Sequence, residues 1–394
     1  MYPPALDGDE LSAWLRLAHT PGIGRALARR LLAQAGSIEA LFAQSPTALG
    51  ALLAPAQRAA LLTTSAAQRD ALQTCWQWLQ TPPEGLTHAV ITLGDARYPA
   101  SLLATEDPPL LLYVAGPAQA FTRADALFPA QRALAMVGSR QPSAQGLIDA
   151  RRFAHDLCLA GLCIVSGMAL GIDGAAHEGA LQAAQSAGAT AGDAGLATIA
   201  VWGTGLDQPY PRRHAALAQR IARAGLLVSE YPLGTPPLAA HFPQRNRIIS
   251  GLAQGTLVVE AALASGSLIT ARLAAEQGRE VFAIPGSIHA PQSHGCHALL
   301  RQGAKLVETA QDVLEELQGL APPATAATPA ASPPAASVES ELLAALGFDP
   351  LGLDELVART GWSAAQLQAA LLELELAGRV ARLPGGMFQR LERG

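Results

Sequence analysis

The stretch TLVVEAALASGSLITARLAAEQGREVFAI, residues 256–284, contains one complete strand–helix–strand unit. The apolar runs at 256–260 and 280–284 have the length of buried strands, and the segment between them carries apolar residues at helical spacing. Apolar strands joined through a helix pair in parallel, and both faces of the resulting sheet are covered. This unit therefore predicts an α/β fold.

The same alternation extends toward the N-terminus. Further short apolar runs, each followed by an amphipathic segment, occur at 133–137, 162–165, 198–202 and 225–229. We therefore expect residues 89–318 to form a Rossmann-like, doubly wound, mostly parallel sheet.

The first 88 residues predict an all-helical domain, because their apolar residues recur at i, i+3 and i+4. The turn TPGIGR, residues 20–25, is similar to that of a helix-hairpin-helix module, whose glycine N–H groups can accept a DNA phosphate. A tight helix–helix turn that needs glycine dihedrals explains the same residues. We favour the turn, because a single GxG is a weak signal.

Residues 319–338, rich in Ala and Pro, predict an extended linker before a small C-terminal domain at 339–394. That domain has the helix–helix–helix–hairpin pattern of a winged helix, with Ser363 as the expected N-cap of its third helix. It holds eight acidic and five basic residues, and Glu373 and Glu375 lie on the third helix. An acidic recognition helix favours a protein contact over DNA.

Composition limits the function classes. The chain has 394 residues and a net charge of −5, which argues against a generic basic nucleic-acid binder but allows a local basic site. Its four cysteines form no close CxxC pair, so we expect no zinc site and a reduced interior. No other metal and no cofactor are expected. Without a signal sequence or an apolar run of spanning length, a cytoplasmic protein with no membrane contact is expected.

Small residues follow several of the predicted strands. Because the carboxyl ends of parallel strands meet at one sheet edge, these residues should line a common crevice. Free N–H groups at such an edge form an anion site. The need for tight turns would explain the glycines at this edge, but it would not explain Arg140. The residues concerned are Gly138, Ser139 and Arg140 after the first strand, Gly167 after the second, and Gly266 and Ser267 after the fifth.

The stretch SGMALGIDGAAH, residues 166–177, holds Asp173 and His177. They could form a general acid/base pair. Alternatively, Asp173 caps the following helix and His177 is a buried, hydrogen-bonded support. We favour the second interpretation, because no nucleophile or metal ligand set accompanies them.

Nucleotide-binding motifs are missing. The loop GSRQPSAQG, residues 138–146, lacks the GxGxxG spacing of dinucleotide-binding folds, and no GK[ST] occurs anywhere. A dehydrogenase and a P-loop NTPase are therefore not expected.

Seven stretches together resemble the bacterial DNA-processing protein A family (DprA, also called Smf). The resemblance covers residues 89–318 and extends more loosely to both flanking domains. The stretches, in chain order, are VGSRQPSAQG, SGMALGIDGAAHEGAL, VWGTGLDQPYP, SEYPLGTPP, HFPQRNRIISGLA, VVEAALASGSLITARLAAEQGREVFAIPG and GCHALLRQGAKLV.

The resemblance implies a non-enzymatic protein of natural transformation. Such a protein would bind and shield incoming single-stranded DNA, load a RecA-type recombinase onto it and form a homodimer. The residues implied for the phosphate site are Gly138, Ser139 and Arg140 with Gly266 and Ser267, flanked by Phe242, Arg245 and Asn246. Residues 183–198 depart from the family pattern as an insertion of small residues, expected to form a surface loop.

The stretch HFPQRNRIISG, residues 241–251, supplies those flanking residues. Pro243 is expected at the first position of a helix, which places Phe242 just outside it, facing solvent or a base. Residues two apart do not share a helix face. We therefore expect Arg245 and Asn246 in the crevice, and Arg247 turned inward to pair with Glu230 or Glu260.

Two other functions stay open. A nucleoside monophosphate phosphoribohydrolase on a related fold would need a glutamate one helical turn after the glycine loop, where this chain has no acid before Glu276. The second open function is an interaction scaffold that acts without DNA and is built on the dimer and the C-terminal domain.

Overall fold

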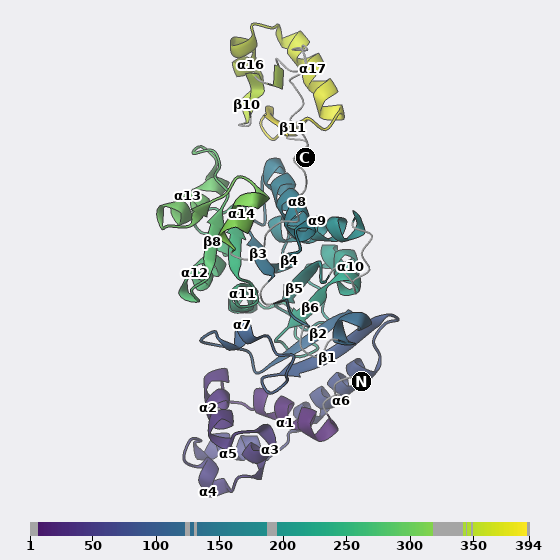
Figure 1. The fold of residues 1–394 in the computed structure, drawn as a ribbon, viewed down its shortest axis with the longest axis vertical. Coiled ribbons are helices and arrows are strands. Elements are labelled where there is room, and N and C mark those ends of the chain that lie inside the picture. The colour runs from purple at the N-terminus through teal and green to yellow at the C-terminus, as the bar shows by residue number, and fades with distance from the viewer. Residues whose placement is uncertain are drawn as a thin grey trace.

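The computed structural model describes residues 7–122, 127–129, 132–186, 195–317, 342–343, 345–347 and 350–391. Half of the insertion (187–194) and the whole predicted linker lie outside the described residues, and so does part of the first predicted helix of the C-terminal domain. Figure 1 shows the helical N-terminal part, the central sheet and the small C-terminal part along the chain.

The central sheet has nine strands in the order β1-β2-β6-β5-β4-β3-β7-β8-β9. The strands from β6 to β9 along this order pair in parallel, whereas β1 and β2 are antiparallel additions next to β6. The strands are β1 Leu86–Thr92, β2 Leu111–Pro117, β3 Ala133–Val137, β4 Cys163–Ser166, β5 Thr198–Trp202, β6 Leu226–Ser229, β7 Gly255–Val258, β8 Glu280–Ala283 and β9 Lys305–Leu306.

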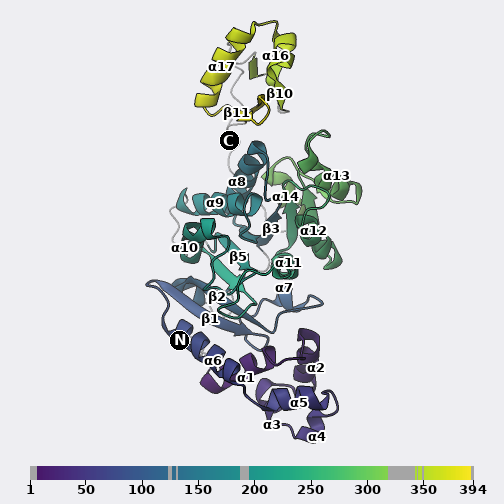
Figure 2. The ribbon, with the colours of Figure 1, turned by 180° about the vertical axis from the view of Figure 1, so that it is seen from behind.

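Helices cover both faces of this sheet (Figure 2). Apolar side chains of α8, α9, α10 and α14 pack on one face, and those of α7, α11, α12 and α13 pack on the other. The fold is therefore doubly wound, as expected. The helices are α7 Ala100–Leu103, α8 Ala144–Leu159, α9 Ile172–Ser186, α10 Ala215–Ala224, α11 His241–Gly251, α12 Ser267–Glu276, α13 His294–Arg301 and α14 Ala310–Glu316, with short 3₁₀ turns at Ala118–Thr122, Arg212–His214 and Pro291–Ser293.

The six predicted strands are all present, within a residue or two of their expected limits. The sequence did not predict β1, β2 and β9. β2 is buried throughout, but β1 and β2 precede the first strand–helix unit, so no alternation marked them. β9 consists of two exposed residues, which are too few to show a pattern.

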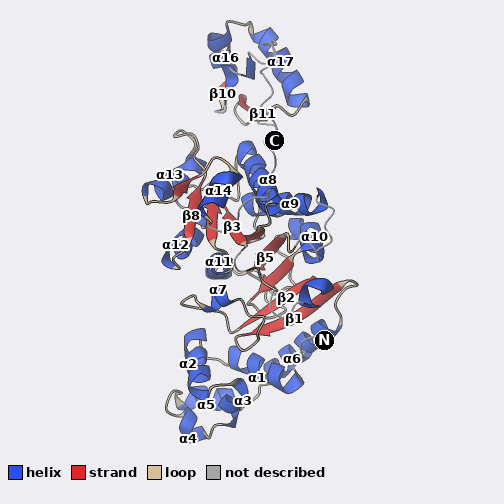
Figure 3. Ribbon diagram, in the orientation of Figure 1, coloured by secondary structure: helices blue, strands red, loops and turns tan. Residues whose placement is uncertain are grey.

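The N-terminal domain is helical and packs on the antiparallel end of the sheet (Figure 3). Its apolar core joins side chains of the helices to Val90 of β1 and to Leu111 and Tyr113 of β2. The helices are α1 Gly8–Ala18, α2 Arg25–Ala35, α3 Ile38–Ala43, α4 Pro46–Leu49, α5 Pro55–Leu62 and α6 Ala66–Gln80.

The C-terminal domain has the expected winged-helix elements. Its three-stranded sheet has the order β10-β12-β11, and Ser363 caps the second of its described helices by accepting from the N–H of Gln366. The turn of the hairpin lies at Gly385 and Gly386, both with positive φ. The elements are β10 Leu351–Gly352, α16 Leu353–Thr360, α17 Ala364–Leu376, β11 Val380–Leu383 and β12 Met387–Arg390.

Across the described residues, every helix is too short or too polar to span a bilayer.

Candidate functional site

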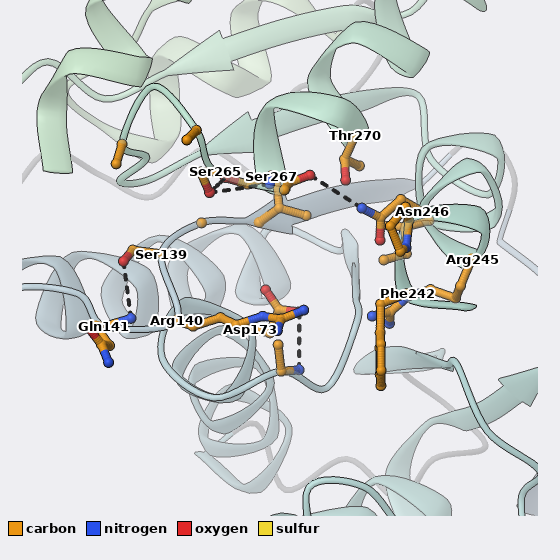
Figure 4. A pocket seen from close by; sticks show the side chains of 18 residues that line it. Ser139, Arg140, Gln141, Asp173, Phe242, Arg245, Asn246, Ser265, Ser267 and Thr270 are labelled. Carbon is orange, nitrogen blue, oxygen red and sulfur yellow. Dashed lines mark hydrogen bonds between the residues drawn. The ribbon is translucent and has the colours of Figure 1, made fainter. Parts of the chain in front are cut away.

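A pocket of about 500 Å³ opens at the carboxyl ends of β3 and β7. Chain connections diverge on either side of this strand pair, which is the topological switch point where open α/β sheets bind ligands. Three segments form most of its walls: the loop after β3, the loop before α12, and the first turns of α11, while Ala169 and Asp173 line it from the loop after β4 and the start of α9 (Figure 4). Eight of the expected site residues line it: Gly138, Ser139, Arg140, Phe242, Arg245, Asn246, Gly266 and Ser267.

Arg140 is the exposed cation of this pocket. Its guanidinium carbon lies 5.7 Å from the centre of the Phe242 ring, within cation–π range. Among the described residues, no carboxylate forms an ion pair with it. Its charge is therefore available to a ligand.

The start of α12 forms the opposite wall. Gly266 is its N-cap residue, and the Asn246 side chain donates to the Gly266 carbonyl at 3.3 Å. The hydroxyls of Ser265 and Ser267 are hydrogen-bonded to each other at 2.6 Å. Within the described part of the chain, the N–H groups of Arg140 and Gly266 donate to no protein acceptor. Free N–H groups, a helix start and an arginine are the kinds of group that bind anions in proteins.

Arg245 differs from the expectation, because its guanidinium does not project freely into the crevice. The residue is 3 % exposed and lies in the floor of the pocket. One terminal nitrogen donates to the carbonyls of Gly167 and Val201, at 2.5 Å in the case of Gly167. Burial lowers the pKa of Arg245 to about 10, and the nearby Asp173 opposes this shift. Arg245 thus contributes positive charge from beneath the pocket.

Gly167 makes room for this arginine. A Cβ at position 167 would lie 2.3 Å from the Arg245 guanidinium, so any larger residue would displace that buried group. Gly167 does not line the main pocket. It lines a neighbouring hollow of about 70 Å³, which Arg140 and Phe242 separate from the main pocket and which Tyr210 also lines.

Asp173 does not cap α9 as expected, because that helix begins one residue earlier, at Ile172. Its carboxylate instead accepts from the N–H groups of Gly167 and Ala169, at 3.1 and 3.2 Å, and so fixes the loop after β4. Burial raises the pKa of Asp173, and Arg245 acts in the opposite direction.

His177 is fully buried, which agrees with a supporting role. Its Nδ1 lies 2.7 Å from the Thr198 hydroxyl, which itself donates to the carbonyl of Ile164. The Nδ1 atom must therefore carry the proton. Burial lowers the pKa of His177 to about 3, so the ring is neutral at physiological pH.

The start of α11 also differs from the expectation. The helix begins at His241, so Pro243 occupies its third position and Phe242 lies inside the first turn. The Phe242 ring still lines the pocket, and it lies 5.4 Å from the Tyr210 ring, centre to centre. The sequence did not single out Tyr210, which is 46 % exposed.

Arg247 turns inward and forms an ion pair with Glu230, which confirms one of its two expected partners. Glu260, the other expected partner, faces the loop between β3 and α8 instead. Asp107 extends the ion-pair network. Its Oδ2 atom lies 3.3 Å from Nε of Arg247 and 2.8 Å from Nη2 of Arg25 in α2. The network thereby links the N-terminal domain to the helix that carries Phe242 and Asn246.

Comparison with known proteins identifies the family. The family model described as DNA recombination-mediator protein A matches residues 89–318, and a DprA winged-helix model matches residues 326–386. The chain belongs to the DNA recombination-mediator protein A family.

Several members of this family are similar over much of the chain. Protein Smf of Escherichia coli (strain K12) is 45% identical over 332 residues, 82% of each chain. DNA processing protein DprA of Streptococcus pneumoniae is 47% identical over 225 residues, which cover 57% of this chain and 72% of that protein. The X-ray structure of DprA from Streptococcus pneumoniae superimposes with a TM-score of 0.62 at 35% identity, covering 79% of this chain and 99% of that one.

In the described part of the chain, the acidic residues near the pocket are few. Among the described residues that line it, Asp173 is the one carboxylate, and it is engaged by two backbone N–H groups. Glu276 is the last residue of α12, at the far end of that helix from the pocket. The described residues contain no group of three or more His, Cys, Asp or Glu placed to hold a metal.

Proposed function

We propose that this protein binds single-stranded DNA, with a backbone phosphate in the pocket at the switch point. The unpaired Arg140 at the mouth of the pocket is the observation that carries the proposal. Beside it lie two free N–H groups and a helix start. The lining residues include two arginines and one aspartate, so their charges sum to +2 − 1 = +1 in a chain that is acidic overall.

An aromatic ring beside the phosphate position supports a single strand rather than a duplex. Phe242 lies next to Arg140, and Tyr210 lies beyond it. Unpaired bases stack on such rings with little dependence on sequence, whereas duplex bases are already stacked on one another. We therefore infer weak base preference and strong dependence on salt.

Family membership supports the biological role. We propose that the protein acts without enzymatic turnover, that it works as a homodimer, and that it loads a RecA-type recombinase on incoming DNA during natural transformation. The acidic α17 of the winged-helix domain supports a protein contact for that domain, because Glu373 and Glu375 would repel phosphates.

Two assays test the proposal against its alternatives. Titration of labelled oligo-dT, followed by fluorescence anisotropy, should give binding that weakens steeply with NaCl. A protein that binds no oligo-dT at low salt would fit the scaffold hypothesis instead. Incubation with nucleoside monophosphates should release no free base. Base release that is lost in Arg140→Ala would establish a phosphoribohydrolase.

A further inference from the structure

A carboxylate of the protein itself occupies the start of α8. Glu260 follows β7, and its side chain accepts two hydrogen bonds from Ser143, the N-cap residue of that helix. The backbone N–H of Ser143 donates to Oε2 at 2.9 Å, and its hydroxyl donates to Oε1 at 2.5 Å. The same hydroxyl accepts from the N–H of Gly146 at 2.9 Å. The carboxylate therefore holds the N-cap residue of the helix through both its backbone and its side chain.

The helix leaves space for this carboxylate. A Cβ at position 146 would lie 2.5 Å from the carboxyl carbon of Glu260 and 2.7 Å from each of its oxygens. Any side chain larger than that of Gly146 would displace the group. Among the described residues, no Lys, Arg or His forms an ion pair with Glu260, so N–H and O–H donors and the helix start stabilise its charge.

The start of α8 is the position where many doubly wound folds bind a phosphate. The loop from β3 to α8 lies at the switch point, and the helix that follows such a loop is the one whose N-terminus binds the phosphates of a nucleotide. Here Glu260 crosses from the neighbouring strand and takes that place. Its backbone carbonyl also accepts from the N–H of Ser139 at 2.7 Å, so the residue holds the loop at both ends.

We propose that Glu260 is a built-in anion that replaces a nucleotide phosphate at the start of α8. It excludes small phosphates from that position, which leaves Arg140 and the start of α12 to bind a ligand. It also fixes the loop that carries Ser139 and Arg140. Glu260 is thus a positioning and specificity residue. Its effect on DNA rests on the proposed function, whereas its occupation of the helix start does not.

Anion rescue of Glu260→Ala tests this directly. The variant removes the carboxylate and leaves its space and its donors. We expect a melting temperature roughly 5 °C below wild type, since two hydrogen bonds to a charged group are lost. Sodium formate should raise it again in a saturable manner, because an anion that binds only the folded state stabilises it. Wild type in the same formate series is the control, with NaCl at equal ionic strength. An identical formate response in both proteins would overturn the proposal.

Gly146→Ala is the matched variant, because it keeps the carboxylate and takes away its place. We expect a similar loss of thermal stability and a roughly fivefold weaker affinity for oligo-dT, neither of which formate restores, since the added methyl fills the position. Wild-type stability and affinity in Gly146→Ala would overturn the proposal. This variant also decides the question if Glu260→Ala fails to fold.

The two proposals fail separately. If wild type binds no oligo-dT, the proposed function is wrong, while the formate-dependent melting of Glu260→Ala still tests the built-in anion. If wild type binds oligo-dT, formate should restore the DNA affinity of Glu260→Ala together with its melting temperature. A stability that formate restores without any effect on DNA affinity would contradict the positioning role.

Discussion

The guanidinium of Arg140 lies over the ring of Phe242, 5.7 Å from its centre. The two residues come from segments about 100 positions apart in the sequence and meet at the boundary between the main pocket and the smaller hollow beside it. The pair joins the two groups that a single strand needs, a cation for its phosphate and a flat surface for its base.

Replacement of Arg140 by alanine should weaken oligo-dT binding for all sequences and reduce the slope of log K against log salt by about one phosphate contact. Arg140→Lys should keep part of the affinity, because it retains the charge but loses the planar fork. Fluorescence anisotropy across a NaCl series measures both quantities. Arg223→Ala, an exposed arginine on α10 at the other face of the sheet, is the control and should match wild type.

Replacement of Phe242 by leucine should weaken oligo-dT binding by about 1–3 kcal/mol, the usual loss when a base loses its aromatic partner. The salt slope should stay unchanged, because no phosphate contact is removed. Phe242→Tyr retains the ring and should bind almost as wild type does. A changed salt slope in Phe242→Leu would show that the ring acts by orienting Arg140 instead.

Disruption of the ion pair between Arg247 and Glu230 should lower the free energy of unfolding. Their side chains are 11% and 6% exposed, and removal of one partner from a buried pair costs about 3–5 kcal/mol. Urea unfolding should show this loss for Arg247→Met and for Glu230→Gln, with a double variant that loses less than the sum. The exposed pair of Arg220 and Glu178 is the control, where the loss should be about 0–1 kcal/mol.

The pH dependence of stability should report His177. Its pKa is lowered to about 3 in the folded protein, while the unfolded chain takes up a proton near its ordinary value of 6.5. Between these values the unfolded state binds the extra proton, so stability falls as pH falls, by about 1.4 kcal/mol per unit. His177→Asn removes this contribution. The difference in unfolding free energy between the two proteins should shrink from pH 7 to pH 4, and a constant difference would contradict a buried, neutral imidazole.

Removal of residues 339–394 should leave the affinity for single-stranded DNA largely intact. The described recognition helix of that domain, α17, carries glutamates and no Lys or Arg. Gel mobility shifts with oligo-dT compare the truncated and full-length chains. A large loss of affinity would refute the protein-contact hypothesis for the winged helix.

The sequence predicted the sheet well where periodicity was strong. Alternating strands and helices located six of the seven parallel strands, and the strand ends located the pocket. It could not predict β9, because two exposed residues carry no pattern. The fold, and not the local sequence, places β1 and β2 beside β6.

The directions of the side chains in the site were harder to predict from the sequence than its location. Both Arg245 and Arg247 turn inward. Arg245 does so because it reaches the buried carbonyls of Gly167 and Val201, which no local sequence pattern reveals. The contact between Glu260 and Ser143 spans 117 positions, so spacing could not predict it. Such pairings depend on which strands become neighbours.

A crystal structure of the protein with oligo-dT would show where the strand lies. We expect a backbone phosphate in the pocket, within hydrogen-bonding distance of the Arg140 guanidinium and the N–H of Gly266, and a base against Phe242. A strand bound only to the helical N-terminal domain or to the winged helix, with the pocket free of DNA, would contradict this expectation.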